Sequence, residues 1–259
     1  MVPPGPEIIV NRLAAAGCVA ADEEADELLA AAPDDASLEA WILRREHGEP
    51  LAWITGTMQF CGRTLGVDPG VYVPRLQSQE LARRAGLLLA AGGLRAADLC
   101  TGAGAIAVEL MAAAPAATVI GVDVDAGAVA CARRNGVQAI VADLDAPLLA
   151  GAFDVVSAVA PYVPTGALHL LPADVLRYEP RMALDGGVDG LDLVRRVVES
   201  AARLLRPGGW LVIELGGAQD RLLSPALTAW GFDLAEAWCD EDGDLRGLVA
   251  QATGSGSGR

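Results

Sequence analysis

Residues 96–107 read Ala-Ala-Asp-Leu-Cys-Thr-Gly-Ala-Gly-Ala-Ile-Ala, a pattern that predicts a short apolar strand, a glycine-rich turn and the start of a helix. Gly102 and Gly104 allow positive φ and a close approach to the backbone, so an adenosine-containing ligand can lie against the turn and the helix N-terminus. With Ala107 they also match the dinucleotide pattern G-x-G-x-x-G/A, which is typical of dehydrogenases. The turn therefore predicts a cofactor site without selecting the cofactor.

Helical and strand-like segments alternate on both sides of this turn. Helices are predicted at residues 79–91, 106–114, 126–135 and 191–205, and strands at residues 96–99, 118–122, 139–141, 153–158 and 210–215. Such alternation indicates an α/β fold of the Rossmann-like type, with a mostly parallel sheet and helices on both faces. Ligands of such folds bind at the carboxyl ends of the strands.

Acidic residues stand at the ends of three successive strands and favour one cofactor. Asp123 lies 21 residues after Gly102, where a carboxylate accepts the ribose hydroxyls of an adenosine. Asp98 stands beside the glycines, where it would repel a pyrophosphate and attract the cationic sulfonium and amino groups of S-adenosylmethionine. Asp143 and Leu144 suit the adenine amine and ring. Each carboxylate alone could simply cap a turn, but their joint occurrence favours a site. The predicted cofactor-binding residues are Asp98, Cys100, Thr101, Gly102, Gly104, Asp123, Val124, Asp143 and Leu144.

The first third of the chain has a different pattern. Residues 7–47 show helical periodicity, with Ser37 as the expected N-cap of the last helix. Residues 53–55, 58–60 and 64–67 alternate like short strands joined by glycine-containing turns. The predicted organisation is an N-terminal helical bundle at residues 1–47, a hairpin linker at residues 48–77, a cofactor-binding domain at residues 78–252 and a disordered tail at residues 253–259.

Composition excludes several classes of function. The chain has 19 arginines and no lysine against 34 acidic residues, so its net charge is −15, and direct binding to nucleic acid is not expected. No apolar stretch reaches the roughly 18 residues of a membrane span. There is no secretory pattern at the start, so a cytoplasmic location is expected. Five scattered cysteines and two histidines lack metal-ligand spacing, and no metal site is predicted.

Longer motifs carry a resemblance to a known family. They are the segments at residues 48–56, 73–75, 161–164, 178–191 and 207–216, together with the glycine turn. With these motifs the chain resembles the class I S-adenosylmethionine-dependent methyltransferases, and more narrowly the HemK/PrmC-type protein-(glutamine) N-methyltransferases. The resemblance implies a seven-stranded sheet and methylation of the glutamine amide in the Gly-Gly-Gln loop of peptide-chain release factors. With Cys100 in place of the family's first glycine and with Ala160 in the substrate motif, the chain is similar to an actinobacterial paralogue branch whose substrate is unassigned.

The family's substrate motif Asn-Pro-Pro-Tyr falls on Val159-Ala160-Pro161-Tyr162, which are the predicted catalytic residues. The resemblance implies that Pro161 and Tyr162 form a wall for a planar amide and that the Ala160 carbonyl accepts one amide hydrogen. In the family this Asn, together with a neighbouring backbone carbonyl, accepts the two amide hydrogens, and the side chain of Val159 cannot accept a hydrogen bond. Phe60 and Arg75, with Pro161 and Tyr162, are the predicted substrate-binding residues, although Phe60 could instead pack a domain joint and Arg75 could lock loops through an ion pair.

Several functions remain open at this level. The leading interpretation is an N-methyltransferase related to the glutamine-modifying enzymes, with a protein substrate such as a release factor. A second keeps the cofactor and changes the acceptor to a small molecule or another protein side chain. A third is a cofactor-binding partner protein without catalysis, motivated by Val159. A dehydrogenase is the remaining alternative.

Overall fold

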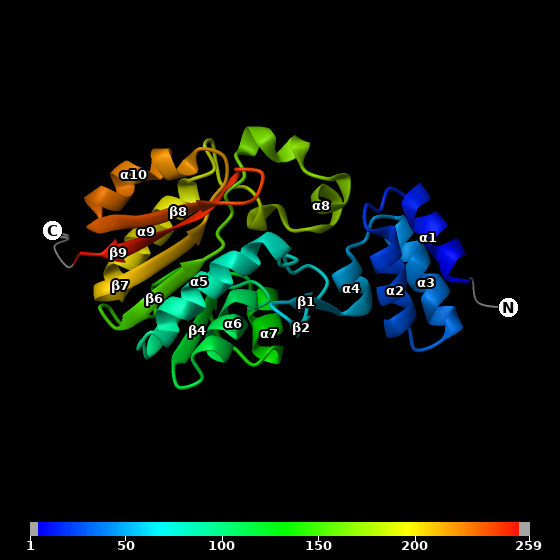
Figure 1. Cartoon of the computed structure of the whole chain (residues 1–259), viewed down its shortest axis with the longest axis horizontal. Coiled ribbons are helices and arrows are strands. Elements are labelled where there is room, and N and C mark those ends of the chain that lie inside the picture. Colours follow the sequence, from blue (N-terminus) through cyan, green and yellow to red (C-terminus); the bar gives the residue numbers. More distant parts are fainter. Residues whose placement is uncertain (1–4, 254–259) are drawn as a thin grey trace.

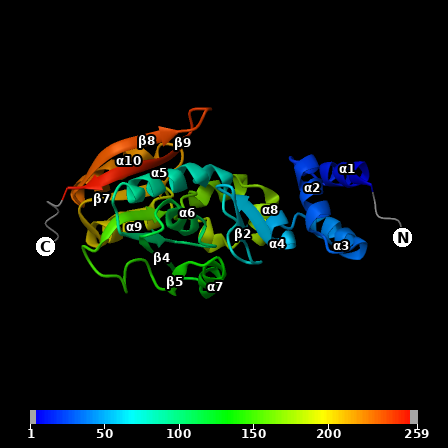
Figure 2. The same ribbon diagram turned by 60° about the horizontal axis from the view of Figure 1, so that its bottom comes forward.

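The computed structural model describes residues 5–253. Figure 1 shows a helical bundle at one end of the molecule and a large sheet at the other, and Figure 2 shows the same separation from a second direction. The predicted tail at residues 253–259 lies, apart from Thr253, outside the described residues.

The bundle consists of α1 (Pro6–Ala15), α2 (Ala21–Ala31) and α3 (Asp35–Glu46), as the helical periodicity predicts. The prediction of Ser37 as an N-cap is wrong. Asp34 caps α3, because its carboxylate accepts a hydrogen bond from the Ser37 amide at 2.7 Å. The helices bury a small apolar core that includes Leu13, Leu28 and Ile42.

The segment between the bundle and the sheet differs in part from its prediction. Residues 53–55 are not a strand but belong to the short helix α4 (Leu51–Thr55), which Gly56 ends with a φ of +77°. A short run such as Trp53-Ile54-Thr55 does not distinguish a strand from a buried helical turn. Here the Trp53 indole is buried and donates to the Val71 carbonyl at 2.9 Å. The hairpin that follows, β1 (Thr57–Phe60) and β2 (Arg63–Gly66), is antiparallel as expected.

The remaining chain forms the α/β part. Its elements are η1 (Leu76–Ser78), α5 (Gln79–Ala90), β3 (Arg95–Leu99), α6 (Ala105–Ala113), β4 (Thr118–Asp123), α7 (Ala126–Arg134), β5 (Gln138–Val141), β6 (Phe153–Ala158), η2 (Thr165–Leu170), α8 (Ala173–Tyr178), η3 (Arg181–Ala183), α9 (Asp192–Leu204), β7 (Leu205–Glu214), α10 (Gln219–Ala229), β8 (Phe232–Cys239) and β9 (Leu245–Ala252).

The sheet has seven strands in the order β5-β4-β3-β6-β7-β9-β8. The strands from β5 to β7 are parallel, and β9 and β8 add an antiparallel edge. This arrangement confirms the predicted Rossmann-like, mostly parallel sheet with seven strands. Strand β7 begins at Leu205, directly after α9, and therefore starts five residues earlier than the strand predicted at residues 210–215.

Two apolar cores lie on opposite faces of this sheet. Helices α5, α6 and α7 pack on one face, and α9 and α10 pack on the other. Neighbouring strand residues divide between them, since Ala96 faces the first core and Ala97 the second. With both faces covered, the carboxyl ends of the parallel strands are the place where loops can form a site. None of the helices within residues 5–253 is long and apolar enough to cross a membrane.

Candidate active site

The glycine turn between β3 and α6 has the strained backbone that the sequence suggests. Cys100, Gly102 and Gly104 have φ values of +56°, +54° and +84°. A Cβ atom on Gly104 would lie 2.9 Å from a Val137 methyl group, so only glycine fits there. A Cβ atom on Gly102 would meet nothing within 4 Å, so the backbone at that position is open to a ligand.

Asp98 lies beneath this turn and is almost completely buried, with 1% of its surface exposed. Its carboxylate accepts hydrogen bonds from the Thr101 hydroxyl at 2.6 Å and the Ser157 hydroxyl at 2.8 Å. Burial raises the pKa of Asp98 to about 6, although both hydroxyls favour the charged form. Asp98 therefore brings a negative charge close behind the turn and fixes Thr101 at the same time.

Asp123 ties the turn to the end of β4. Its Oδ2 accepts from the Gly102 amide at 2.9 Å, and its Oδ1 accepts from the Asp125 amide at 3.0 Å. Burial raises the pKa of this carboxyl. Each carboxylate oxygen can accept two hydrogen bonds, so Asp123 keeps capacity for ribose hydroxyls. Val124, which follows it, is half exposed.

The end of β5 brings two further predicted residues to the same edge of the sheet. Leu144 is buried with a φ of +49°, and the exposed Asp143 pairs with Arg196 of α9 at 2.8 Å. Cys100 faces the second apolar core, and burial raises the pKa of its thiol. A protonated thiol is a poor nucleophile, so Cys100 is better explained as a small residue of the turn.

This donor set fits S-adenosylmethionine. The Asp98 and Asp123 carboxylates lie against a turn with open backbone, and negative charge at this place attracts a cationic ligand and disfavours a pyrophosphate. Asp123 can hold the ribose, while Asp143 and Leu144 can contact the adenine.

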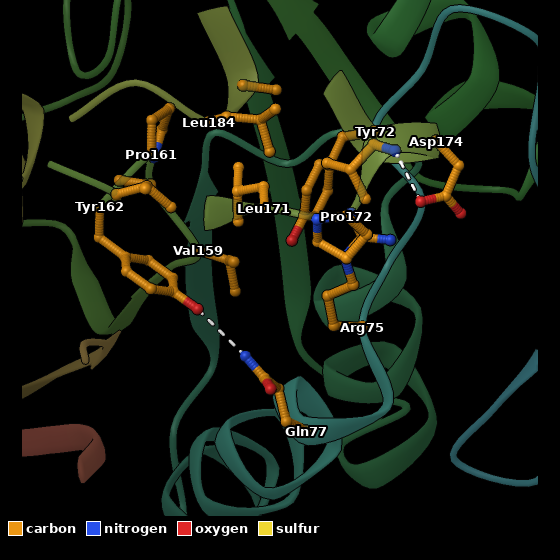
Figure 3. Close-up of a pocket in the computed structure, with 14 residues that line it drawn as sticks. Tyr72, Arg75, Gln77, Val159, Pro161, Tyr162, Leu171, Pro172, Asp174 and Leu184 are labelled. Carbon is orange, nitrogen blue, oxygen red and sulfur yellow. Dashed lines mark hydrogen bonds between the residues drawn. The ribbon is translucent and has the colours of Figure 1, made fainter. Parts of the chain in front are cut away.

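A cavity of about 410 Å³ lies at the carboxyl end of β6 (Figure 3). Three stretches of chain form its walls: the loop after β6, the segment before η1 and the irregular region around α8 and η3. Most of its lining is apolar, as in many ligand pockets of this size. The lining residues are Tyr72, Arg75, Gln77, Val159, Ala160, Pro161, Tyr162, Val163, Leu171, Pro172, Asp174, Val175, Ala183 and Leu184.

Tyr162 belongs to a hydrogen-bonded group at one side of this cavity. Its hydroxyl donates to Glu214 Oε1 at 2.9 Å and accepts from Gln77 Nε2 at 3.0 Å. The Ser78 hydroxyl donates to Glu214 Oε2 at 2.5 Å. Burial, followed by the negative charge of Glu214, raises the pKa of Tyr162 far above its usual range, so this phenol keeps its proton.

A glycine-rich loop after η3 supports the backbone of residues 161–163. The Gly186 amide donates to the Val163 carbonyl at 2.8 Å, and a Cβ atom on Gly186 would lie 2.8 Å from the Pro161 carbonyl oxygen. The Gln219 amide group donates to the Tyr162 carbonyl at 2.8 Å. The backbone around Gly186 approaches the backbone of residues 161–163 so closely that a side chain would not fit, which explains why the loop after η3 is rich in glycine.

Arg75 joins the loop before η1 to the loop after α8 through an ion pair, which is one of the two roles predicted for it. It pairs with the buried Glu179 at 2.6 Å and lies over the Tyr72 ring at 4.8 Å. Glu179 also accepts a hydrogen bond from the Val73 amide at 3.4 Å. Burial raises the pKa of Tyr72 to about 12. Arg75 lines the cavity, but its charge is already paired.

The predicted catalytic and substrate-binding residues separate into two groups. Arg75, Val159, Ala160, Pro161 and Tyr162 come together on the cavity wall. Phe60 is 3% exposed and packs in the apolar core that also contains Trp53, which corresponds to the domain-joint alternative. Sequence reasoning missed Tyr72, Gln77 and Glu214. Gln77 and Glu214 have partners that are distant along the chain. Tyr72 contacts Arg75, three residues away, and Gln77 lies two residues after Arg75, so the position of Arg75 was the signal for both.

Comparisons with known proteins agree with this geometry. Residues 96–177 match the family model described as "Methyltransferase domain". The release factor glutamine methyltransferase of Geobacter sulfurreducens is 40% identical over 197 residues, covering 74% of this chain and 69% of the relative. The chain belongs to the release factor glutamine methyltransferase family. It is therefore an enzyme that uses S-adenosylmethionine to transfer methyl groups.

One further relative and two solved structures are similar to this chain. A 4-amino-L-phenylalanine/4-methylamino-L-phenylalanine methyltransferase of Streptomyces pristinaespiralis is 37% identical, with 80% of this chain and 74% of the relative covered. The fold is that of a ribosomal protein L11 methylase from Lactobacillus delbrueckii subsp. bulgaricus, with a TM-score of 0.54, 17% identity and coverage of 72% and 84% of the two chains. TYW2 of M. jannaschii, solved with AdoMet, has a TM-score of 0.50 and 12% identity, with coverage of 75% and 84%.

Proposed function

We propose that this methyltransferase methylates the side-chain amide of a glutamine in a protein, with a peptide-chain release factor as the acceptor to test first. One observation carries the proposal. The last residues of β3 and β6, Leu99 and Ala158, are register partners in neighbouring strands. The glycine turn and the loop of Pro161 and Tyr162 therefore leave the sheet side by side, so a bound cofactor and the acceptor cavity would be adjacent.

The chain's own residues would position the acceptor nitrogen. S-adenosylmethionine supplies the methyl group, and the nitrogen forms a bond to that carbon as the carbon–sulfur bond breaks and one proton leaves to solvent. Pro161 and Tyr162 offer a flat wall for the amide, and the Ala160 carbonyl can accept one amide hydrogen. Alignment of the nitrogen lone pair and exclusion of water supply most of the catalysis in such a displacement.

The surroundings of the cavity favour a protein acceptor. Leu76, Leu170 and Met182 are 64%, 74% and 60% exposed, and each is adjacent in sequence to a residue of the cavity wall. Exposed apolar side chains gathered around a pocket are typical of protein-binding surfaces. The net charge of −15 also suits a basic protein segment better than an anionic metabolite.

A small-molecule amine is the second candidate, and Val159 is the observation that favours it. An amide nitrogen shares its lone pair with the carbonyl and has to be oriented by hydrogen-bond acceptors, whereas an amine needs less help. The apolar Val159 replaces such an acceptor on the cavity wall. The Streptomyces pristinaespiralis relative is named for an aromatic amine, so its amino acid is the matching probe.

Transfer of a tritiated methyl group separates the two candidates. The protein would be incubated with labelled S-adenosylmethionine and, in parallel, release factor, release factor with Ala in place of the glutamine of its Gly-Gly-Gln loop, or 4-amino-L-phenylalanine. Label in the unmodified release factor alone supports the proposal. Label only in the amino acid would replace it with the second candidate.

A further inference from the structure

Glu214, at the end of β7, organises one side of the acceptor cavity. Its buried carboxylate accepts from the Ser78 hydroxyl at 2.5 Å, the Tyr162 hydroxyl at 2.9 Å and Gln77 Nε2 at 3.3 Å. All three contacts are made by donors, so each partner turns a hydrogen toward the Glu214 carboxylate.

This arrangement fixes which way the Gln77 amide points. The Tyr162 hydroxyl gives its proton to Glu214, so its oxygen is free to accept from Gln77 Nε2 at 3.0 Å. The opposite orientation would place the Gln77 oxygen against the Glu214 carboxylate, where two acceptors repel each other. The nitrogen end of Gln77 is thus engaged, and its oxygen, Oε1, receives no hydrogen bond from the residues that the structure describes.

Gln77 is itself one of the residues that line the cavity. Figure 3 shows its side chain reaching toward Tyr162, on the side of the cavity to which Val159 also belongs. Val159 contributes only methyl groups there. Gln77 is therefore a polar group of the wall that can replace the hydrogen-bond acceptor missing at position 159.

We propose that Gln77 Oε1 accepts a hydrogen from the amide nitrogen of the substrate glutamine and restores the orienting contact that Val159 cannot make. The inference rests on the proposed glutamine acceptor. With Gln77 Oε1 and the Ala160 carbonyl, both hydrogens of the substrate amide have an acceptor. The nitrogen can then be held with its lone pair toward the methyl group.

Two substitutions at position 77 separate accepting a hydrogen bond from donating one. Gln77→Met removes both abilities at similar length. Gln77→Lys keeps a donor for Tyr162 and Glu214 but has no acceptor. Each variant is made with Val159 and with Val159→Asn, and kcat/KM for methyl transfer to release factor is measured. The affinity for S-adenosylmethionine, by calorimetry, and the melting temperature serve as controls because Gln77 lies outside the predicted cofactor residues.

The proposal predicts that both Gln77 variants lose about ten- to a hundredfold in kcat/KM, as expected for one missing hydrogen bond to a buried amide. It predicts unchanged cofactor affinity, and recovery of most of the activity when Val159→Asn is added. Activity retained by Gln77→Lys but lost by Gln77→Met would show that Gln77 acts only by donating to Tyr162, and would overturn the proposal. So would loss without recovery by Val159→Asn, or no loss in either variant. A wild-type protein that leaves glutamine unlabelled refutes the proposed function itself, and this inference with it.

Discussion

Replacing Asp98 by Asn should stabilise the protein and weaken cofactor binding, in a manner that depends on pH. The buried carboxyl has its pKa raised from 3.8 to about 6, mainly by desolvation. A shift of about two units corresponds to about 3 kcal/mol. Because the folded pKa is the higher one, wild-type stability is complete below the unfolded pKa and falls as pH rises through the folded pKa. Asn has no charge to desolvate and therefore escapes this penalty.

The sign of the effect can be followed through the local hydrogen bonds. In Asp98→Asn the amide oxygen can still accept from Thr101, and the Ser157 hydroxyl can rotate to accept from the new NH₂ group. The neutral amide makes weaker hydrogen bonds to Thr101 and Ser157 than the carboxylate does, and this costs about 1 kcal/mol. The variant should therefore be more stable than the wild type by about 2 kcal/mol at pH 8, with S-adenosylmethionine bound about tenfold more weakly because one negative charge is lost.

Urea denaturation of both proteins between pH 5 and pH 8 tests this reasoning. The range stays above the sequence pI of about 4.4, where the chain would be poorly soluble. About half of the free-energy penalty for burying the Asp98 charge, about 1.5 kcal/mol, develops between pH 5 and pH 8. The difference in stability between Asp98→Asn and the wild type should therefore grow by that amount across the range. A difference that is constant across the range would refute the burial argument for Asp98. Unchanged cofactor affinity, measured by calorimetry at pH 8, would refute its electrostatic role.

Three further variants test other parts of the site. Asp123→Ala should weaken S-adenosylmethionine binding by about 1–3 kcal/mol through the loss of charge-assisted hydrogen bonds, and an unchanged calorimetric affinity would contradict the cofactor placement. Gly104→Ala should lower the unfolding free energy by about 2–3 kcal/mol from steric overlap and positive φ. Its matched control Gly136→Ala, with a similar φ of +86° and open space, should lose only about 1 kcal/mol, so equal losses would argue against the overlap. Arg75→Met should cost about 3–5 kcal/mol by leaving the Glu179 carboxylate buried and unpaired, and a change below 1 kcal/mol in urea denaturation would contradict that pairing.

The regular part of the fold could be predicted from local patterns. Strand β6 was predicted with its observed bounds, and β3, α6, β4 and α7 were predicted within one residue at each end. These elements have strong periodicity and glycine-rich turns. The prediction failed at α4, because the short run of residues 53–55 is compatible with either conformation. It assigned no elements to α8, α10, β8 or β9. Their positions depend on packing across the sheet, which no local pattern expresses.

The candidate site was only partly accessible from the sequence. Asp98, Asp123 and Pro161 could be placed because they lie at or shortly after the ends of strands, and these ends meet at one edge of a parallel sheet. The partnership of Gln77 with Glu214 joins residues 137 positions apart. Such a contact depends on the complete fold, so its role in the cavity could not be predicted from spacing.

Tandem mass spectrometry of release factor after incubation with this protein and S-adenosylmethionine tests the central claim most directly. The account predicts one additional methyl group on the side-chain amide nitrogen of the glutamine in the Gly-Gly-Gln loop, and a smaller methylated fraction at limiting S-adenosylmethionine when Asp123→Ala replaces the wild-type enzyme. Release factor that stays unmethylated at this glutamine, while the protein binds the cofactor and methylates a different acceptor, would contradict it.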